Sequence, residues 1–325
     1  MIASRMIRGL MVLAVVACLL TIEDQALAQY RPTYLPGLAG LDAGSQPPPG
    51  IYLSNLIYIY PTDTVRNDKG DNITPRGNVG ITAFMEAVAF VYVTNVKILG
   101  GNLGGELVIP WMKNRISLAS LEANPTLGYS DTLWVPFQLG WHKEKADYTI
   151  AYMIAFPTGR RQPASGLDQT EHIIQAGTTV HLDKAKSWSA AGLFSLALNE
   201  GKNHQDIKVG TSGTVEWGVG KAFIKPIQNR PVPLIAKVGP IGYTQFKITE
   251  DSGNDIPPAL RGFKDRVFAF GVNGNVLLPW TGTIVDFKYL HEVGARTRTE
   301  GQAFVITITQ VLKQLTPKPA AAPKP

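Results

Sequence analysis

Hydrophobic and polar residues alternate with a period of two in several stretches, which is the pattern of β-strands with two different faces. In 148–156 every second residue is large and apolar, with small or polar residues between them. The same alternation runs through 135–141, where it places Val135 on the same face as Phe137. From residue 50 onward, runs rich in Val, Ile, Thr, Tyr and Phe are broken by Gly, Pro, Asn and Asp. This pattern predicts an all-β protein.

The segments between the runs alternate in length, and this rhythm separates a barrel from a soluble β-sandwich. Long polar segments such as 61–79 and 250–263 follow the odd strands, and short turns follow most of the even ones. Outer-membrane barrels have such an asymmetry, together with an even strand number. We therefore predict a transmembrane antiparallel β-barrel of about twelve strands with an irregular N-terminal segment. The predicted strands lie near 50–60, 80–98, 102–113, 131–142, 147–157, 171–182, 187–198, 211–224, 233–249, 264–279, 281–292 and 301–312.

The N-terminus has the features of an export signal. Two arginines precede an apolar stretch over 10–22, and an Ala-Leu-Ala site ends at Ala28. We predict a signal peptide over 1–28 that is cleaved after Ala28. The alternative is lipidation at Cys18, the single cysteine. No later stretch is long and apolar enough for a transmembrane helix, so a place in the membrane would require a closed barrel.

Three further regions follow from composition. Residues 29–49 form a Pro/Gly-rich N-terminal segment, 50–312 the barrel, and 313–325 a Pro/Ala/Lys tail. Polar residues on the predicted inward face are candidates for the lumen lining, and Asp286 and Lys288 are expected to pair with each other. These candidates are Gln138, His142, Asn273, Asn275, Asp286 and Lys288. Aromatic residues near strand ends are expected in the two interfacial girdles: Tyr58, Tyr60, Trp111, Trp134, Trp141, Trp188, Trp217, Trp280 and Tyr289.

Charge and motifs exclude several classes of function. The net charge of +6 is spread along the chain, so we expect no nucleic-acid-binding face. His291-Glu292 lacks a second histidine four positions on, and the five histidines have no metal-ligand spacing. With no nucleophile elbow or phosphate-binding loop either, we predict no enzyme, no cofactor and no metal. The acidic run 251–255 is expected to be a turn rather than a calcium loop. Arg160-Arg161 is expected in a turn, with lipopolysaccharide contact as the alternative.

Several short motifs follow one another along the mature chain in the order expected for one family. They are Tyr34-Leu35-Pro36-Gly37, Pro47-Pro48-Pro49-Gly50-Ile51-Tyr52, Gly128-Tyr129-Ser130-Asp131, Phe156-Pro157-Thr158-Gly159 and Gly242-Tyr243-Thr244-Gln245. The chain thereby resembles the SphA-like outer-membrane proteins of the phenol meta-pathway degradation family. This resemblance implies an outer-membrane barrel that admits aromatic or other hydrophobic compounds, and an N-terminal segment, here 29–49, that plugs or lines the lumen. The Pro/Ala/Lys tail from Gln314 to Pro325 departs from barrels that end on an aromatic strand residue.

The expected function is a passive channel for small hydrophobic compounds in the bacterial outer membrane. Its expected partners are outer-membrane lipid, lipopolysaccharide and the solute. One alternative is an adhesion or structural barrel whose long loops bind a partner. Another is an outer-membrane lipid hydrolase, which needs a Ser–His pair on the barrel exterior. In this sequence, that pair would be His181 with Ser187 or Ser189.

Overall fold

The computed structural model describes residues 32–74, 79–118, 121–159, 165–228, 232–256 and 261–315. The predicted signal peptide, nearly all of the C-terminal tail and Arg160-Arg161 lie outside these ranges. Within the described ranges, no helix is long and apolar enough to cross a membrane.

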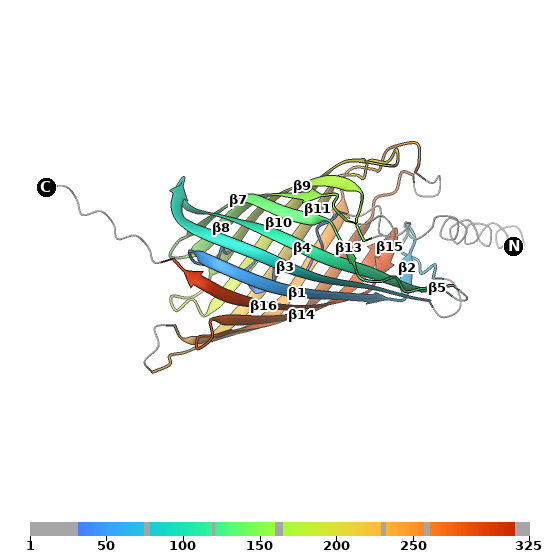
Figure 1. Ribbon diagram of the computed structural model, residues 1–325. Helices are drawn as coiled ribbons and strands as arrows, with labels where there is room; N and C mark the ends of the chain where they lie inside the picture. Colours follow the sequence, from blue (N-terminus) through green and yellow to red (C-terminus); the bar gives the residue numbers. More distant parts are fainter. Residues whose placement is uncertain are drawn as a thin grey trace, which may run out of the picture.

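Among the described residues, twelve strands close into a ring in which each strand is antiparallel to its neighbours (Figure 1). The ring runs β3-β1-β16-β14-β13-β12-β11-β10-β9-β8-β7-β4 and closes through the pairing of β3 with β4. These elements confirm the predicted fold class and lie within a few residues of the predicted strands. Their bounds are β1 Gly50–Thr62, β3 Val79–Ile98, β4 Gly101–Leu118, β7 Thr132–His142, β8 Ala146–Phe156, β9 Gln169–His181, β10 Trp188–Lys202, β11 Ser212–Lys225, β12 Leu234–Lys247, β13 Arg266–Leu278, β14 Thr283–Arg296 and β16 Gln302–Gln314.

Short elements outside the ring gather at the end with the long loops, on the right in Figure 1. The strands β2 (Thr64–Arg66) and β15 (Arg298–Glu300) pair as a separate two-stranded sheet. The strands β5 (Leu121–Ala123) and β6 (Gly128–Tyr129) both pair with β4. We call this end the loop end, and the opposite end, where β16 finishes, the turn end.

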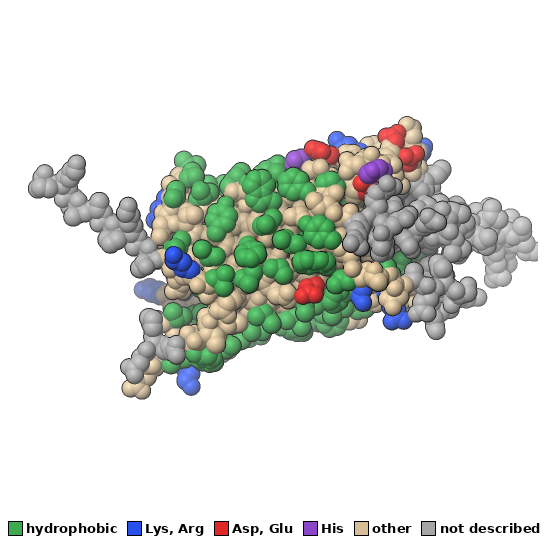
Figure 2. Space-filling view, viewed as in Figure 1, with side chains coloured by type: hydrophobic (Ala, Val, Ile, Leu, Met, Phe, Trp, Pro, Cys, Tyr) green, Lys and Arg blue, Asp and Glu red, His purple; other side chains and the backbone are tan. Residues whose placement is uncertain are grey.

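The outer wall of the barrel is apolar, as a lipid-facing surface must be. In β8 the large side chains of Tyr148, Ile150 and Phe156 are exposed, and the small residues between them point inward. Similar outward residues recur around the ring, for example Ile174 and Phe270, which are 50% and 55% exposed. Figure 2 shows apolar side chains spread across the wall, with charged groups mostly toward its two ends.

Two expectations about strand faces are wrong. Val135 does not share a face with Phe137, because the register between β7 and β8 shifts between Trp134 and Phe137. Pro136 has no N–H to donate to a sheet, and prolines in strands accompany such bulges. Val135 is therefore 3% exposed and packs against Tyr34 in the lumen, whereas Phe137 is 42% exposed.

Tyr58 and Tyr60 are not girdle residues either. They are 4% and 7% exposed and belong to a buried cluster inside the barrel. The hydroxyl of Tyr60 donates to Glu292, so the polar end of the ring finds its partner in the lumen rather than in interfacial water. By contrast, Trp134, Trp188 and Trp280 are exposed.

Candidate functional site in the barrel lumen

The N-terminal residues 32–49 lie inside the barrel and contact strands around the ring. This segment contains one short 3-10 turn, η1 (Gly40–Asp42), and pairs with no strand, so its backbone N–H groups need side-chain acceptors. Thr33 N donates to Glu171 Oε2 at 2.8 Å, Leu41 N to Asn273 Oδ1 at 3.1 Å, and Gly44 N to Thr179 Oγ1 at 3.2 Å. We call residues 32–49 the lumen segment.

Glu216 of β11 anchors the lumen segment at two points. It is 2% exposed, and its Oε2 accepts the backbone N–H of Ala39 at 3.0 Å. Its Oε1 accepts the hydroxyl of Tyr34. Hydrogen bonds to a carboxylate are about twice as strong as neutral ones. One wall side chain therefore fixes two points of the segment, five residues apart.

Small residues on the wall make room for the segment. A Cβ at Gly140 would lie 2.5 Å from the Cβ of Gln46, and one at Gly218 would lie 3.0 Å from the carbonyl oxygen of Gly40. On the segment itself, a Cβ at Gly44 would lie 2.0 Å from the carbonyl carbon of Thr178. At these three glycines the segment and the wall approach so closely that any larger residue would displace one of them.

Four of the predicted lumen residues come together on β13 and β14. Asn273 is opposite Lys288, and Asn275 is opposite Asp286. Asn273 Nδ2 donates to Asp286 Oδ2 at 2.8 Å while its Oδ1 accepts Leu41 N. Lys288 and Asp286 form the ion pair expected from their spacing. This cluster supports the lumen segment.

The other two predicted residues lie toward the turn end of β7. Gln138 Oε1 accepts Gln46 Nε2 at 3.3 Å. His142 Nδ1 lies 3.2 Å from Asp147 Oδ1, and the other carboxylate oxygen of Asp147 accepts the hydroxyl of Ser45 at 2.8 Å. The two groups of predicted residues thus contact the same segment at separate points rather than forming one site.

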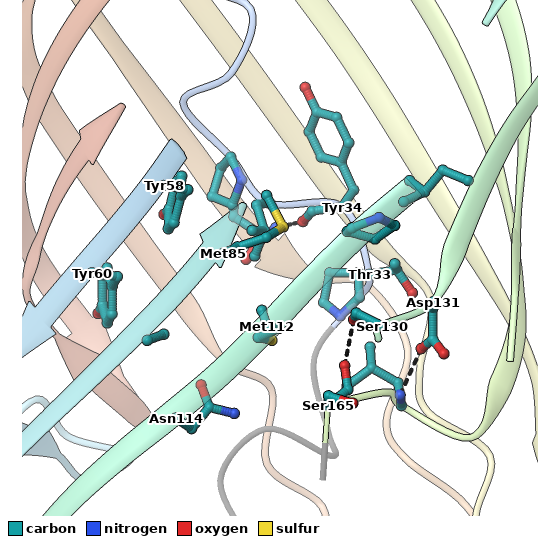
Figure 3. A pocket seen from close by; sticks show the side chains of 18 of the residues that line it. Thr33, Tyr34, Tyr58, Tyr60, Met85, Met112, Asn114, Ser130, Asp131 and Ser165 are labelled. Atoms are coloured by element: carbon teal, nitrogen blue, oxygen red, sulfur yellow. Dashed lines mark hydrogen bonds between the residues drawn. The ribbon is translucent and has the colours of Figure 1, made fainter. Parts of the chain in front are cut away.

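A cavity of about 140 Å³ remains beside the first residues of the lumen segment (Figure 3). Four of its large side chains come from three adjacent strands: Tyr58 and Tyr60 from β1, Met85 from β3 and Met112 from β4. Residues 32–36 form another side. An apolar cavity of about 150 Å³ holds one benzene molecule. The space therefore matches one aromatic ring.

Polar groups close the cavity at the loop end. Asp131 Oδ1 accepts Gly159 N at 2.9 Å and its Oδ2 accepts Leu167 N at 2.6 Å. Burial raises the pKa of this carboxyl above its usual range, and these two hydrogen bonds oppose the rise. Ser130 donates to the backbone carbonyl of Ser165 beside it. Asp131 thus holds the two ends of the connection between β8 and β9 beside the cavity.

A buried ionic cluster forms a further part of the cavity lining. Arg298 of β15 turns inward, with Nη1 at 3.5 Å from Asp265 and Nη2 at 3.6 Å from Glu292. Its Nη1 also donates to Gln245 Oε1 at 3.0 Å. Tyr243 donates to Glu292 Oε1 at 2.8 Å. Removing one member would leave buried charge uncompensated, so the cluster fixes this wall.

Sequence reasoning missed the carboxylates Glu171, Glu216 and Glu292. A signal was present for one of them: Glu216 lies inside the predicted strand 211–224, between Val215 and Trp217, whereas Glu171 and Glu292 stand at the ends of their predicted strands. A carboxylate flanked by outward apolar residues in a membrane strand must face the lumen.

Neither catalytic nor metal chemistry is supported where the chain is described. His181 and Ser189 are cross-strand neighbours on the inner face, and none of their side-chain polar atoms has a hydrogen-bond partner. A lipid hydrolase would need this pair outside. In the described part of the chain, no group of three or more His, Cys, Asp or Glu could hold a metal ion. In the predicted turn 251–255, Asp251 binds Lys247 Nζ at 2.7 Å.

Known proteins resemble this chain in sequence and fold. No protein of curated function matches the sequence. An outer membrane channel from Pseudomonas putida F1 has 11% sequence identity and a TM-score of 0.65 over 86% of this chain and 100% of its own. The β domain of the Bordetella autotransporter BrkA has 8% identity and a TM-score of 0.48 over 81% of this chain and 100% of its own. The first likeness identifies the fold as that of an outer-membrane barrel.

A family model described as the putative MetA-pathway of phenol degradation matches residues 62–308, which is most of the chain. The match spans nearly the whole barrel, from the end of β1 into β16. The chain therefore belongs to the family of the putative MetA-pathway of phenol degradation.

Proposed function

We propose that the protein is an outer-membrane channel that admits small hydrophobic compounds, single-ring aromatics among them, by passive diffusion. The apolar outer wall supports a location in a membrane. The similarity of the barrel to that of an outer membrane channel supports the bacterial outer membrane in particular. Family membership supports aromatic compounds as the solutes.

The observation that carries the proposal is the cavity beside the lumen segment. It is bounded by two tyrosines and two methionines, and methionine adapts its shape to different apolar partners. Arg298 and Glu292 of the lining are already paired with each other, and Asp131 accepts two backbone N–H groups. A small solute would therefore bind mainly through weak apolar contacts, which suits a step on a path that the solute must also leave. The lumen segment narrows the path so that a ring passes in contact with these side chains.

Uptake by outer-membrane vesicles with and without the protein tests the proposal. The solutes are toluene, phenol, a long-chain fatty acid and, as a hydrophilic control of similar size, a small sugar. We expect the protein to raise the entry of the hydrophobic solutes and to leave entry of the sugar nearly unchanged. Heat-modifiable gel migration verifies that the protein forms a closed barrel in the vesicles that contain it. Equal uptake of all solutes would contradict the channel.

Deletions that shorten the loops 61–79 and 250–263 distinguish the channel from an adhesion barrel whose loops bind a partner. A channel keeps its solute uptake after the loops are shortened, whereas an adhesin loses surface binding and has no uptake to keep.

A further inference from the structure

Two arginines oppose each other on the outer wall at the loop end. Arg266 is the first residue of β13, Arg296 is the last of β14, and their Cα atoms are direct partners across the two strands. Both are exposed. Their neighbours Val267 and Ala295 are at most 1% exposed and belong to the buried cluster inside the barrel. Because successive side chains in a strand alternate between faces, the two guanidinium groups point outward.

A β-bulge is what brings Arg296 to the outer face. Phe268 pairs with Val293 and Arg266 with Arg296, so β14 has one residue more than β13 between these two pairs. The extra residue is accommodated at Gly294, whose φ is +65°. Arg296 is three positions beyond Val293, which faces outward. In a regular strand, residues three positions apart face opposite sides, so without the bulge Arg296 would face the lumen. A bulge that redirects a side chain in this way is a designed feature of a sheet rather than a defect.

The two guanidinium groups have no counter-charge on the protein. Among the described residues, neither Arg266 nor Arg296 forms an ion pair or a hydrogen bond with a carboxylate; Arg266 lies over the ring of Phe268, 6.0 Å from its centroid. Asp265, the nearest acidic residue in sequence, turns inward to Arg298. Between residues 32 and 315, Glu122 is the acidic residue whose side chain is not described, and it belongs to β5, which pairs with β4 rather than with β13 or β14. Like charges directly opposite each other in a sheet are destabilising. A bound anion between the two guanidinium groups would remove this repulsion.

The surroundings identify the kind of anion. Directly below the arginines, the outward side chains of β13 are Phe268, Phe270 and Val272, and the latter two are 55% and 51% exposed. The arginines therefore stand where the apolar belt ends at the loop end. A molecule bound here would place its anionic group between two guanidinium forks and its apolar part along the belt.

We propose that Arg266 and Arg296 together bind the phosphate group of an anionic membrane lipid in the leaflet at the loop end. A free phosphate ion would use the two arginines but would gain nothing from the apolar belt beneath them. The inference rests on the membrane location proposed above, but it does not depend on which solute the lumen admits.

Native mass spectrometry of the full-length protein in detergent micelles tests this site. The probe is bis-phosphorylated lipid A, with the dephosphorylated lipid as comparison and inorganic phosphate as competitor. We expect the protein to retain the phosphorylated lipid preferentially. The double substitution Arg266→Gln and Arg296→Gln should weaken retention about thirtyfold. The control pair Lys97→Gln and Lys225→Gln removes two exposed charges at the turn end and should leave retention unchanged.

The outcomes separate the lipid site from its alternatives and from the channel. Equal retention of both lipids by the unmodified protein, or equal loss in both double variants, would overturn the proposal. Displacement of the lipid by equimolar inorganic phosphate would show a free-phosphate site and would also overturn it. Lipid retention is measured without any solute. A loss of lipid retention therefore does not affect the uptake result, and a failure of solute uptake does not affect the lipid site. Heat-modifiable migration establishes that each variant has a closed barrel.

Discussion

Two regions of the barrel wall differ in what lies against their inner face: one contacts the lumen segment directly, and the other borders a cavity. On β7 to β11, inward residues such as Gly140 and Gly218 leave room for the lumen segment, and Glu171 and Glu216 accept its N–H groups. On β1, β3 and β4, the large inward side chains at the cavity are Tyr58, Tyr60, Met85 and Met112, and the cavity lies between them and the segment. Strand alternation is the same in both regions. The size and charge of the inward residue therefore decide whether a wall holds protein or leaves space for a solute.

The largest expected effect comes from the ionic cluster that fixes the cavity side. Arg298→Met leaves Glu292 and Asp265 buried without their cation, and we expect a loss of about 3–5 kcal/mol in the free energy of unfolding. Guanidinium unfolding of the refolded barrel measures it. The control Arg66→Met breaks the 2.5 Å pair with Glu300, in which the Arg66 side chain is 29% exposed, and should cost about 1 kcal/mol or less. Equal losses would mean that Arg298 does not fix this wall.

A smaller effect is expected where the segment is anchored. Glu216→Ala removes the acceptor of both the Tyr34 hydroxyl and the Ala39 N–H. Each group left unsatisfied should lower the stability of the docked segment by about 1–3 kcal/mol. Hydrogen exchange should accelerate over 33–45 while the exchange of the barrel strands stays slow. The matched control Glu86→Ala removes a carboxylate that binds Asn55 on the wall, away from the segment. Unchanged exchange over 33–45 in the Glu216 variant would contradict the anchor.

The close approach at Gly44 gives the next smaller effect. Gly44→Ala places a methyl group against the backbone of Thr178 and should displace the segment locally, at a cost of about 1–3 kcal/mol. Exchange should rise near residue 44 and remain slow at Thr33 and Tyr34, which Glu171 still holds. Gly80→Ala is the control, since a Cβ there meets nothing within 4 Å. Uniform acceleration along the whole segment would show that Glu171 and Glu216 do not act as independent anchors.

How far the sequence predicts this molecule depends on whether a feature is periodic. The strands were predictable because alternation repeats in each of them, and the barrel because loop length alternates as well. Local departures were not: Pro136 shifts the register and moves Val135 inward, and nothing in the alternation marks that shift. The face of Tyr58 and Tyr60 was misjudged because an aromatic residue at a strand end suits either the girdle or the lumen.

The candidate site was less predictable than the fold for a physical reason. Asn273, Asp286 and Lys288 could be placed on the inner face from strand parity alone. The cavity depends instead on where a segment without secondary structure lies, and contacts such as Tyr34 with Glu216 join residues 182 positions apart. No local pattern encodes such a contact. Glu216, a carboxylate within an apolar strand, was the available signal.

The most direct test of the account is binding of a single-ring solute to the cavity. Fluorine NMR of 4-fluorophenol is titrated with the refolded protein and with Met112→Trp, which fills the cavity with a larger side chain. Ile109→Trp on the outward face of β4 is the control. We predict saturable binding by the unmodified protein and by the Ile109 variant, and loss of the saturable component in Met112→Trp with little change in stability. Equal saturable binding by all three proteins would contradict the claim that the cavity receives the solute.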